Sequence, residues 1–483
     1  MSVRVIIVSS EVIPFSKTGG LADVAGALPV ALKKLGAEVS VFTPFYREVA
    51  DKKLKLKNTG KVVSVPIGRR VVTGEILEGE TQGVPVYFIK KDEFFDRSFL
   101  YTAPEGDYFD NLERFTFFSR AVLEAAHVLG LKPDVIHCND WQSGLIPAYI
   151  KSVYSHSYGN TATMFTIHNL AYQGTFPAAL YDTIGLPGEM FSMEGFEFYG
   201  QLNLLKGGIA YSDVVTTVSE GYAREVQTKE YGCGLEGMLK KRAASLHGIL
   251  NGVDYDVWDP SVDSLIVKKY SAGSLNGKVA NKSALTAEYG ITTGPKTPVI
   301  GLISRFADQK GFDILSDAME SIMAMDVCMV ILGSGDVRYQ RLFEALAVKF
   351  KGKLGVRAAF DNRLSHLIEA GSDMFLMPSR YEPCGLNQIY SLRYGTVPVV
   401  RATGGLDDTI RDYAGGSGNG FKFKDYSWNA LLDKLTEAVT LYKKDQVAWQ
   451  SLMKKGMAED FSWDRSARRY MELYGSALAE KKT

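Results

Sequence analysis

The amino-acid sequence has few cysteines, no excess of charge of either sign and no hydrophobic run long enough to cross a membrane. Its 483 residues include 55 Lys plus Arg and 55 Asp plus Glu, so no whole-molecule positive field exists to attract nucleic acid. An apolar stretch of roughly 20 residues, which a transmembrane helix needs, is missing. We therefore expect neither a nucleic-acid partner nor a membrane partner.

The cysteines exclude further classes of protein. The four cysteines lie far apart and form no C-x-x-C pair, which argues against a zinc site and against a disulfide framework. The first strand-like run starts within three residues of the N-terminus, which leaves no room for a signal peptide. We expect a reduced, cytoplasmic protein.

Two common phosphate-binding signatures are also missing. The chain has neither the G-x-G-x-x-G dinucleotide fingerprint nor the G-x-x-x-x-G-K-[ST] P-loop. A nicotinamide-dependent oxidoreductase with two α/β domains would need such a motif, and we keep it only as an alternative.

What the chain does contain is a regular alternation of apolar runs and helical patterns. Strand-like runs in the first half include residues 3–8, 39–42, 134–137, 164–167 and 214–217. Apolar strands that alternate with helices are typical of a parallel sheet covered on both faces. The sequence therefore predicts an α/β fold, with a β insertion at residues 61–89, where three short runs lie close together.

A cluster of turn-forming residues at 251–260 divides this pattern into two series. The second series starts at residues 298–303. We predict two Rossmann-like, doubly wound domains, 1–252 and 253–460, followed by a C-terminal helix in 461–483. Ligands of such sheets bind beyond the carboxyl ends of the strands.

A glycine pair, Gly19-Gly20, follows the first strand-like run and precedes a helical pattern. Glycines at such a turn leave backbone N–H groups at the start of a helix, where the helix dipole favours an anion. Lys17 adds an ammonium group beside them. The pattern favours a phosphate or a phosphorylated sugar at the tip of the first strand, with a plain tight turn as the alternative.

Three charged residues of the second half also follow strand-like runs. Arg305 and Lys310 lie five residues apart on one loop, and two fixed cations suit a diphosphate because negative charge builds on a leaving phosphate. Solvated surface cations are the alternative. Glu382 precedes a proline that can start a helix, so its alternative role is to cap that helix.

Polar groups close other strand-like runs. Asp140 follows one run and His168-Asn169 follows another, although a lone histidine at such a place is more often structural. A second glycine pair, in residues 403–406, repeats the first pattern and could supply N–H groups to the same ligand.

Together these segments resemble the glycogen and starch synthases of glycosyltransferase family 5. The matching segments are residues 17–24, 137–141, 165–174, 305–313, 382–386 and 403–406, and the resemblance runs from about residue 4 to the final helix. It implies the GT-B arrangement, in which two Rossmann-like domains face each other across a deep cleft and the last helix crosses back to the first domain.

The resemblance also implies an activity and the residues that carry it. The activity is retaining transfer of glucose from ADP-glucose to the non-reducing end of an α-1,4-glucan such as glycogen. The implied catalytic residues are Glu382, Arg305, Lys310, His168 and Asp140. The implied substrate-binding residues are Lys17, Gly19, Gly20, Asp23, Asn169, Thr403, Gly404, Gly405 and Leu406.

The alternatives within this class are UDP-glucose as the donor and a non-catalytic glucan-binding protein, and no residue signals an oligomeric state. Tyr390 stands where many GT-B enzymes have a second glutamate, although tyrosine agrees with the family-5 pattern. The resemblance implies no metal and no other cofactor. Asp254-x-Asp256, a pattern that can hold manganese, lies in the predicted domain crossing, which argues against a metal role.

Overall fold

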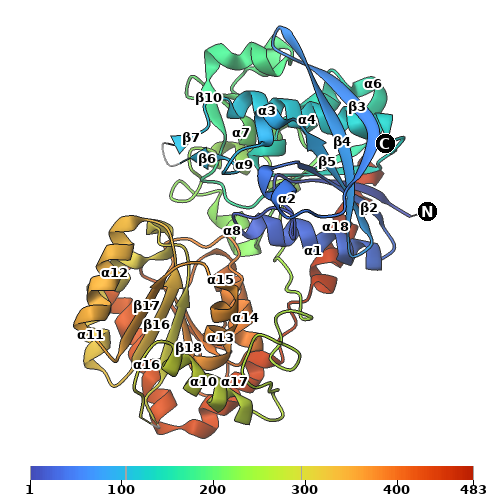
Figure 1. Cartoon of the computed structure of the whole chain (residues 1–483). Helices are drawn as coiled ribbons and strands as arrows, with labels where there is room; N and C mark the ends of the chain where they lie inside the picture. Colours follow the sequence, from blue (N-terminus) through green and yellow to red (C-terminus); the bar gives the residue numbers. More distant parts are fainter. Residues whose placement is uncertain (1, 104–105, 295, 482–483) are drawn as a thin grey trace. The chain divides into compact units, whose positions relative to one another are not determined.

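The computed structural model describes residues 2–103, 106–294 and 296–481. The chain divides into two compact units, each built on a largely parallel sheet with helices packed against it (Figure 1). Unit 1 consists of Met1–Val218, Ala223–Gly252 and Trp463–Thr483, and unit 2 consists of Ser219–Tyr222 and Val253–Ser462.

A nine-stranded sheet lies at the centre of unit 1, in the order β14-β13-β9-β8-β1-β2-β5-β4-β3. Its strands are β1 Arg4–Val8, β2 Glu38–Pro44, β3 Lys57–Ile67, β4 Arg70–Thr81, β5 Val84–Lys90, β8 Val135–Asn139, β9 Ala162–Ile167, β13 Val214–Thr217 and β14 Leu246–Gly248. Neighbours from β14 to β5 are parallel, whereas β3 and β4 form an antiparallel hairpin beside β5. The hairpin confirms the predicted β insertion.

Helices and short strands complete unit 1. The helices include α1 Gly20–Lys34, α2 Arg47–Asp51, α3 Asp92–Phe95, α4 Asn111–Val128, α5 Ile146–Lys151, α6 Ser155–Tyr158, α7 Leu204–Tyr211, α9 Glu236–Lys241 and α18 Trp463–Glu480. The strands β10 Thr175–Pro177, β11 Glu197–Phe198 and β12 Gln201–Asn203 form a small separate sheet. In α1 the residues at spacings of three and four are buried, so this helix covers the sheet with one apolar face.

The last helix, α18, drawn in red in Figure 1, belongs to unit 1. It packs against α1 and β9. The Tyr474 hydroxyl lies 2.8 Å from Nδ1 of His137 in β8, and Lys481 Nζ lies 3.3 Å from Asp213 Oδ2. The C-terminal helix is thus joined to the first sheet by both packing and polar contacts.

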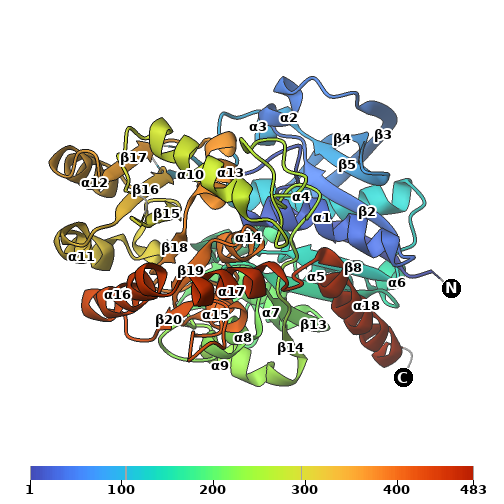
Figure 2. The same cartoon turned by 90° about the horizontal axis from the view of Figure 1, so that it is seen from below.

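Unit 2 is built on a six-stranded sheet in the order β17-β16-β15-β18-β19-β20, parallel throughout. The strands are β15 Val299–Ile303, β16 Cys328–Gly333, β17 Leu354–Ala358, β18 Met374–Met377, β19 Val397–Arg401 and β20 Phe421–Phe423. The helices are α10 Asn276–Glu288, α11 Phe312–Ala324, α12 Val337–Lys349, α13 Asn362–Gly371, α14 Asn387–Arg393, α15 Gly404–Thr409, α16 Trp428–Lys444 and α17 Gln446–Met457. In Figure 2, α16 and α17 lie along the β19–β20 side of the sheet, which they contact.

Both sheets contain a point at which the direction of strand addition reverses. In unit 1 the chain builds β2 on one side of β1 and later adds β8 on the other side. In unit 2 it builds β16 and β17 on one side of β15 and later adds β18 on the other. Open α/β sheets bind ligands outside the carboxyl ends of the strands at such switch points. The two switch points therefore lie between β1 and β8 in unit 1 and between β15 and β18 in unit 2.

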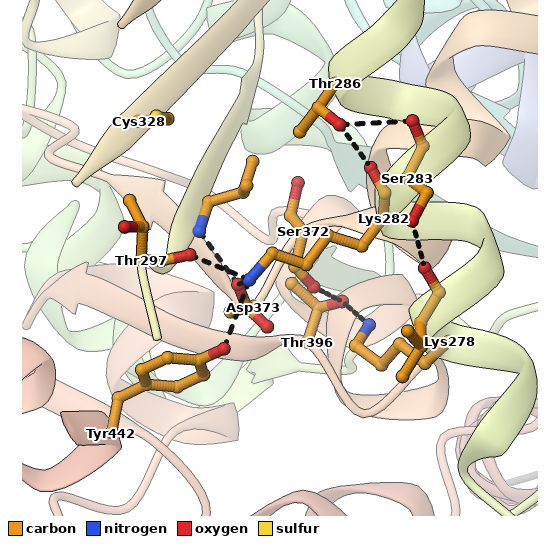
Figure 3. Close-up of polar contacts among 12 residues, drawn as sticks. Lys278, Lys282, Ser283, Thr286, Thr297, Cys328, Ser372, Asp373, Thr396 and Tyr442 are labelled. Carbon is orange, nitrogen blue, oxygen red and sulfur yellow. Dashed lines mark hydrogen bonds and ion pairs between the residues drawn. The ribbon is translucent and has the colours of Figure 1, made fainter. Parts of the chain in front are cut away.

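The opposite, amino-terminal edge of the unit 2 sheet carries buried polar contacts (Figure 3). Asp373 precedes β18 and accepts hydrogen bonds from Lys282 Nζ at 2.7 Å and from the backbone N–H of Val299 at 2.8 Å. Lys278 Nζ donates to Thr396 Oγ1 at 2.6 Å. These contacts join α10 to the beginnings of three strands and stabilise the unit away from the switch point.

Candidate functional site

The carboxyl ends of β15 and β18 bring Lys310 and Glu382 together. Arg305 and Lys310 lie in the loop after β15, and Glu382 lies in the loop after β18. Gly311 ends the first loop with a φ of 74°, and a Cβ atom there would lie 2.0 Å from the carbonyl oxygen of Pro378. Glycine is therefore required for this loop to approach the end of β18 so closely.

Lys310 and Glu382 form an ion pair with little exposure to water. Lys310 Nζ lies 2.8 Å from Oε1 and 2.6 Å from Oε2 of Glu382, and the Ser379 hydroxyl donates to Oε2 at 3.0 Å. Glu382 is only 5% exposed, so these contacts compensate its charge in place of water. The structure thus joins two residues that the sequence predicts for one site, although they are 72 positions apart.

Arg305 differs from Lys310 in its surroundings. It is exposed, and within the described residues its guanidinium has no hydrogen-bond or ion-pair partner. The β15 loop therefore offers one cation that is already paired and one that is available to an anion.

Glu382 does not cap the helix that follows it. Helix α14 begins only at Asn387, and its N-cap residue, Leu386, has no side-chain cap hydrogen bond. The capping role considered for Glu382 is wrong, because residues 383–386 separate the carboxylate from the helix.

The second glycine pair packs against the backbone of the Glu382 segment. Gly404 has a φ of 45°, and a Cβ atom on it would lie 2.1 Å from the carbonyl oxygen of Glu382. A Cβ atom on Gly405 would lie 2.0 Å from the carbonyl oxygen of Cys384. Both glycines are required by close backbone contact, and the turn supports the chain that carries the carboxylate.

We expected the backbone N–H groups of this turn to be available to a ligand, but two of them are already hydrogen-bonded. The N–H of Gly405 donates to the Glu382 carbonyl at 3.0 Å, and that of Leu406 donates to the Thr403 carbonyl at 3.0 Å. These two groups therefore have acceptors inside unit 2. Substrate binding by residues 403–406 stays a prediction.

In unit 1, the carboxyl ends of β8 and β9 bring Asp140 and His168 together. Asp140 has a φ of 54°, which residues other than glycine rarely adopt, and its Oδ1 accepts the backbone N–H of His168 at 2.8 Å. His168 Nε2 lies 2.9 Å from Asn139 Oδ1, while Asn139 Nδ2 donates to the Val8 carbonyl at 3.1 Å. Because the amide nitrogen of Asn139 is the donor to Val8, its oxygen accepts from His168, which assigns the ring proton to Nε2.

Burial sets the charge of both residues. It lowers the pKa of His168 to about 3, so the ring is neutral at pH 7. It raises the pKa of Asp140 to about 7, and the negative charge of Glu11 adds to this rise. The neutral ring therefore brings no positive charge, and because its Nε2–H is donated to Asn139, its Nδ1 is left as a hydrogen-bond acceptor. The neighbouring Asn169 is partly used in a local turn, where its Oδ1 accepts the backbone N–H of Ala171 at 3.1 Å.

The first glycine loop is held by Glu11, a residue that the motifs did not reveal. The Glu11 carboxylate accepts the backbone N–H of Thr18, the Thr18 hydroxyl at 2.6 Å and the backbone N–H of Gly19 at 3.1 Å. Our expectation that the N–H groups of the glycine pair are open to phosphate is therefore wrong for Gly19. The available signal was a carboxylate placed between the first strand and the glycine pair.

Lys17 is also paired within this loop, because its Nζ lies 2.7 Å from Asp23 Oδ1. Burial raises the pKa of Asp23, and the charge of Lys17 opposes this rise. Substrate binding by Lys17, Gly19, Gly20 and Asp23 stays a prediction.

Comparison with known proteins identifies the family. Residues 4–241 match the starch synthase catalytic domain, and residues 290–451 match glycosyl transferases group 1. The glycogen synthase of Koribacter versatilis is 50% identical over 475 residues, which cover 97% of each chain. The chain belongs to the glycogen and starch synthase family. The glycogen synthase of Syntrophotalea carbinolica is 46% identical over 98% of this chain and 99% of its own.

Solved structures agree with this assignment. The catalytic domain of starch synthase IV from Arabidopsis thaliana, bound to ADP and acarbose, has a TM-score of 0.91 at 34% identity and covers 99% of this chain. The sucrose-phosphate synthase of Thermosynechococcus elongatus, with a TM-score of 0.60 at 18% identity, shares the fold alone. The predicted two-domain α/β fold of GT-B type is confirmed, and this family member is a glycosyltransferase.

In this member of the synthase family, the side chain of Tyr390 packs against other aromatic rings. Its ring stacks on Trp258 with centroids 3.9 Å apart, and the ring of His366 also stacks on Trp258, at 3.8 Å. The position that holds a second glutamate in many GT-B enzymes is therefore packed among aromatic rings here.

The described part of the chain contains no group of three or more His, Cys, Asp or Glu side chains placed to hold a metal ion. Asp254 Oδ1 accepts the backbone N–H of Asp256 at 2.9 Å, so the D-x-D string forms a local turn. Within the described residues, no helix combines the length and the apolar character that membrane crossing requires.

Proposed function

We propose that this glycosyltransferase transfers glucose from ADP-glucose to the non-reducing end of an α-1,4-glucan, with retention of configuration. The observation that carries the proposal is the Lys310–Glu382 ion pair at the switch point of unit 2, with the exposed Arg305 on the same loop as Lys310. The related Arabidopsis structure holds ADP and acarbose, which supports an adenine nucleotide donor and a glucan acceptor.

In the proposed reaction, the bond between glucose C1 and the diphosphate oxygen breaks, and a bond from C1 to an acceptor hydroxyl oxygen forms on the same face. The proton of that hydroxyl leaves with ADP. Negative charge builds on the departing diphosphate, and Arg305 and Lys310 stabilise it. These cations serve where other transferases use a metal ion, so no cofactor is part of the proposal.

The ion pair gives Glu382 a defined role in the proposed reaction. In the free protein both carboxylate oxygens contact Lys310. We expect the donor diphosphate to compete for Lys310, which leaves the carboxylate to accept hydrogen bonds from the glucosyl hydroxyls. Ser379 keeps Glu382 oriented when Lys310 is engaged.

Unit 1 contributes polar groups that suit a sugar. His168 is neutral, so it binds hydroxyls by hydrogen bonds, and Asp140 fixes it through the backbone. We infer that these two residues orient the glucosyl ring, and that the loop with Lys17, Gly19 and Gly20 contacts the donor. We also infer a reducing, cytoplasmic setting, which is supported by four cysteines that form no disulfide in the described part of the chain.

The test is incubation with labelled ADP-glucose and labelled UDP-glucose in parallel, with glycogen as the acceptor, with and without a chelator. We expect labelled polymer from ADP-glucose and no effect of the chelator. Labelling only from UDP-glucose would show that UDP-glucose, and not ADP-glucose, is the donor. Labelling from neither would favour a non-catalytic glucan-binding protein. Loss of labelling in the chelator would contradict the metal-free proposal.

A further inference from the structure

We propose that Glu11 is a positioning residue, which fixes the loop of residues 16–20 and thereby places the substrate-binding groups of that loop. The inference rests on the proposed function, because it gives Glu11 a part in the same transfer reaction. Glu11 lies between β1 and α1, at the switch point where β8 pairs with β1.

Four groups donate hydrogen bonds to the Glu11 carboxylate. They are the backbone N–H of Thr18, the Thr18 hydroxyl at 2.6 Å, the backbone N–H of Gly19 at 3.1 Å and the Tyr101 hydroxyl at 2.9 Å. Only an ionised carboxylate has the lone pairs to accept all four. Glu11 is 3% exposed, and a buried carboxylate is costly unless it is hydrogen-bonded. The Glu11 charge and the loop amides therefore stabilise each other, through charge-assisted hydrogen bonds.

The segment just before this loop, residues 14–15, is held by different contacts. Lys52 Nζ donates to the carbonyl oxygens of Pro14 at 2.9 Å and Phe15 at 2.7 Å. The Phe15 ring is 3% exposed and packs edge-on against Phe88 of β5, with centroids 5.0 Å apart. Residues 14–15 are thus fixed by packing and by a cation from the end of α2.

Side-chain packing does not hold the glycine pair itself. Cβ atoms built on Gly19 and Gly20 would meet no atom within 4 Å. Without Glu11, the N–H groups of Thr18 and Gly19 would lose their acceptor. The loop would then be held by the backbone pairing of Ser16 with Val12 and by the Lys17–Asp23 ion pair, neither of which fixes the amides of residues 18 and 19. A reacting group displaced by about 1 Å can slow a reaction on the order of 10²-fold. Glu11 thus acts on the rate through the loop and not by touching the substrate.

The test compares E11A and E11Q with a matched control, E80A. Glu80 also accepts a backbone N–H, from Gly83 at 3.2 Å, but in the β4–β5 turn at the opposite edge of the parallel strands. For E11A we expect kcat to fall about 10²-fold while the KM for ADP-glucose changes by no more than about threefold, because positioning acts mainly in the transition state. We expect E11Q to recover about tenfold of this loss, since its amide oxygen can still accept the two N–H groups. E80A should keep the wild-type kcat.

Hydrogen exchange of the peptide that covers residues 16–20 gives a second readout that does not depend on activity. We expect faster exchange in E11A and wild-type exchange in E80A. An E11A enzyme with wild-type kcat, or with wild-type exchange in this peptide, would overturn the proposal. If E11A does not fold, the E11Q variant provides the test instead. A wild-type kcat in E11Q would then reject the positioning role of Glu11. A wild-type protein that makes no glucan from ADP-glucose would instead refute the proposed function, whatever the exchange data show.

Discussion

The two glycine pairs of the molecule follow strands in the same way, yet the structure requires glycine at only one of them. At Gly404 and Gly405, added Cβ atoms would lie 2.1 Å and 2.0 Å from backbone carbonyl oxygens of the Glu382 segment. At Gly19 and Gly20, added Cβ atoms would meet nothing within 4 Å.

The difference teaches that one sequence pattern can have two physical causes. In unit 2 the glycines let two backbone segments come into contact, so the pair supports the backbone of the segment that carries Glu382. In unit 1 the fold leaves the space beside the glycines open, and the N–H of Gly19 is held by the Glu11 carboxylate. Open space at a switch point is what a ligand that approaches the backbone needs.

The largest expected effect comes from removing the paired cation of unit 2, which leaves both glycine pairs intact. We expect K310A to lower kcat by roughly 10²-fold or more, because one charge-stabilising group is lost from the departing diphosphate. The melting temperature and the kcat of K349A serve as the control, since Lys349 pairs with Glu320 on the surface. A K310A enzyme with near wild-type kcat would remove Lys310 from the mechanism.

The next largest effect is a loss of stability that we expect at the glycine pair of unit 2 and not at that of unit 1. We expect G405A to lower the free energy of unfolding by about 1–3 kcal/mol, because backbone cannot move aside as a flexible side chain can. Denaturant unfolding measures this change. G237A is the control, since a Cβ atom on Gly237 in α9 would meet nothing within 4 Å. Equal stability of G405A and wild type would mean that the close contact does not constrain the turn.

The glycine pair of unit 1 should give the opposite result. We expect G19A and G20A to keep wild-type stability, because Gly19 has an extended backbone with a φ of −152° and Gly20 is the first residue of α1. We expect kcat/KM to fall about tenfold, since a methyl group would displace a donor that approaches this backbone. Steady-state kinetics beside thermal unfolding test both parts. Wild-type kinetics in both variants would show that no ligand approaches the pair.

The smallest effect concerns the amino-terminal edge of unit 2, where charge acts on stability and not on turnover. Burial lowers the pKa of Lys278 to about 7, whereas an unfolded lysine has a pKa of about 10.4. Between these values the unfolded chain binds more protons, so stability rises with pH. We expect the stability of wild type relative to K278M to increase by about 1 kcal/mol from pH 7 to pH 8.

Denaturant unfolding at the two pH values measures this difference. Burial raises the pKa of Glu369 to about 8 and the charge of Lys278 opposes this rise, so both proteins carry Glu369→Gln to remove its titration from the comparison. Surface Lys349→Met is the control and should show no such change. Parallel stability curves for wild type and K278M would contradict a neutral, buried Lys278.

The sequence predicts the fold class because strands that are buried on both faces leave continuous apolar runs. The run at residues 3–8 contains β1, and the run at 298–303 contains β15. Positions of candidate residues after strands could also be predicted, and Glu382 and Lys310 follow β18 and β15 as expected.

The contacts of those residues could not be predicted in the same way. Glu11 reaches Thr18 locally, but its role depends on how the loop turns back, which no motif records. The reason for each glycine depends on what lies beside it in space: Cys384 contacts Gly405 because β18 and β19 are neighbours in the sheet.

The most direct test of the central claim is to extend glycogen with labelled ADP-glucose and then digest the product with β-amylase, which releases maltose from the non-reducing ends of α-1,4 chains. We expect the wild-type enzyme to yield label in maltose and K310A to yield little, because the cations at the switch point of unit 2 carry the transfer. Label that resists β-amylase, or equal incorporation by wild type and K310A, would contradict the claim.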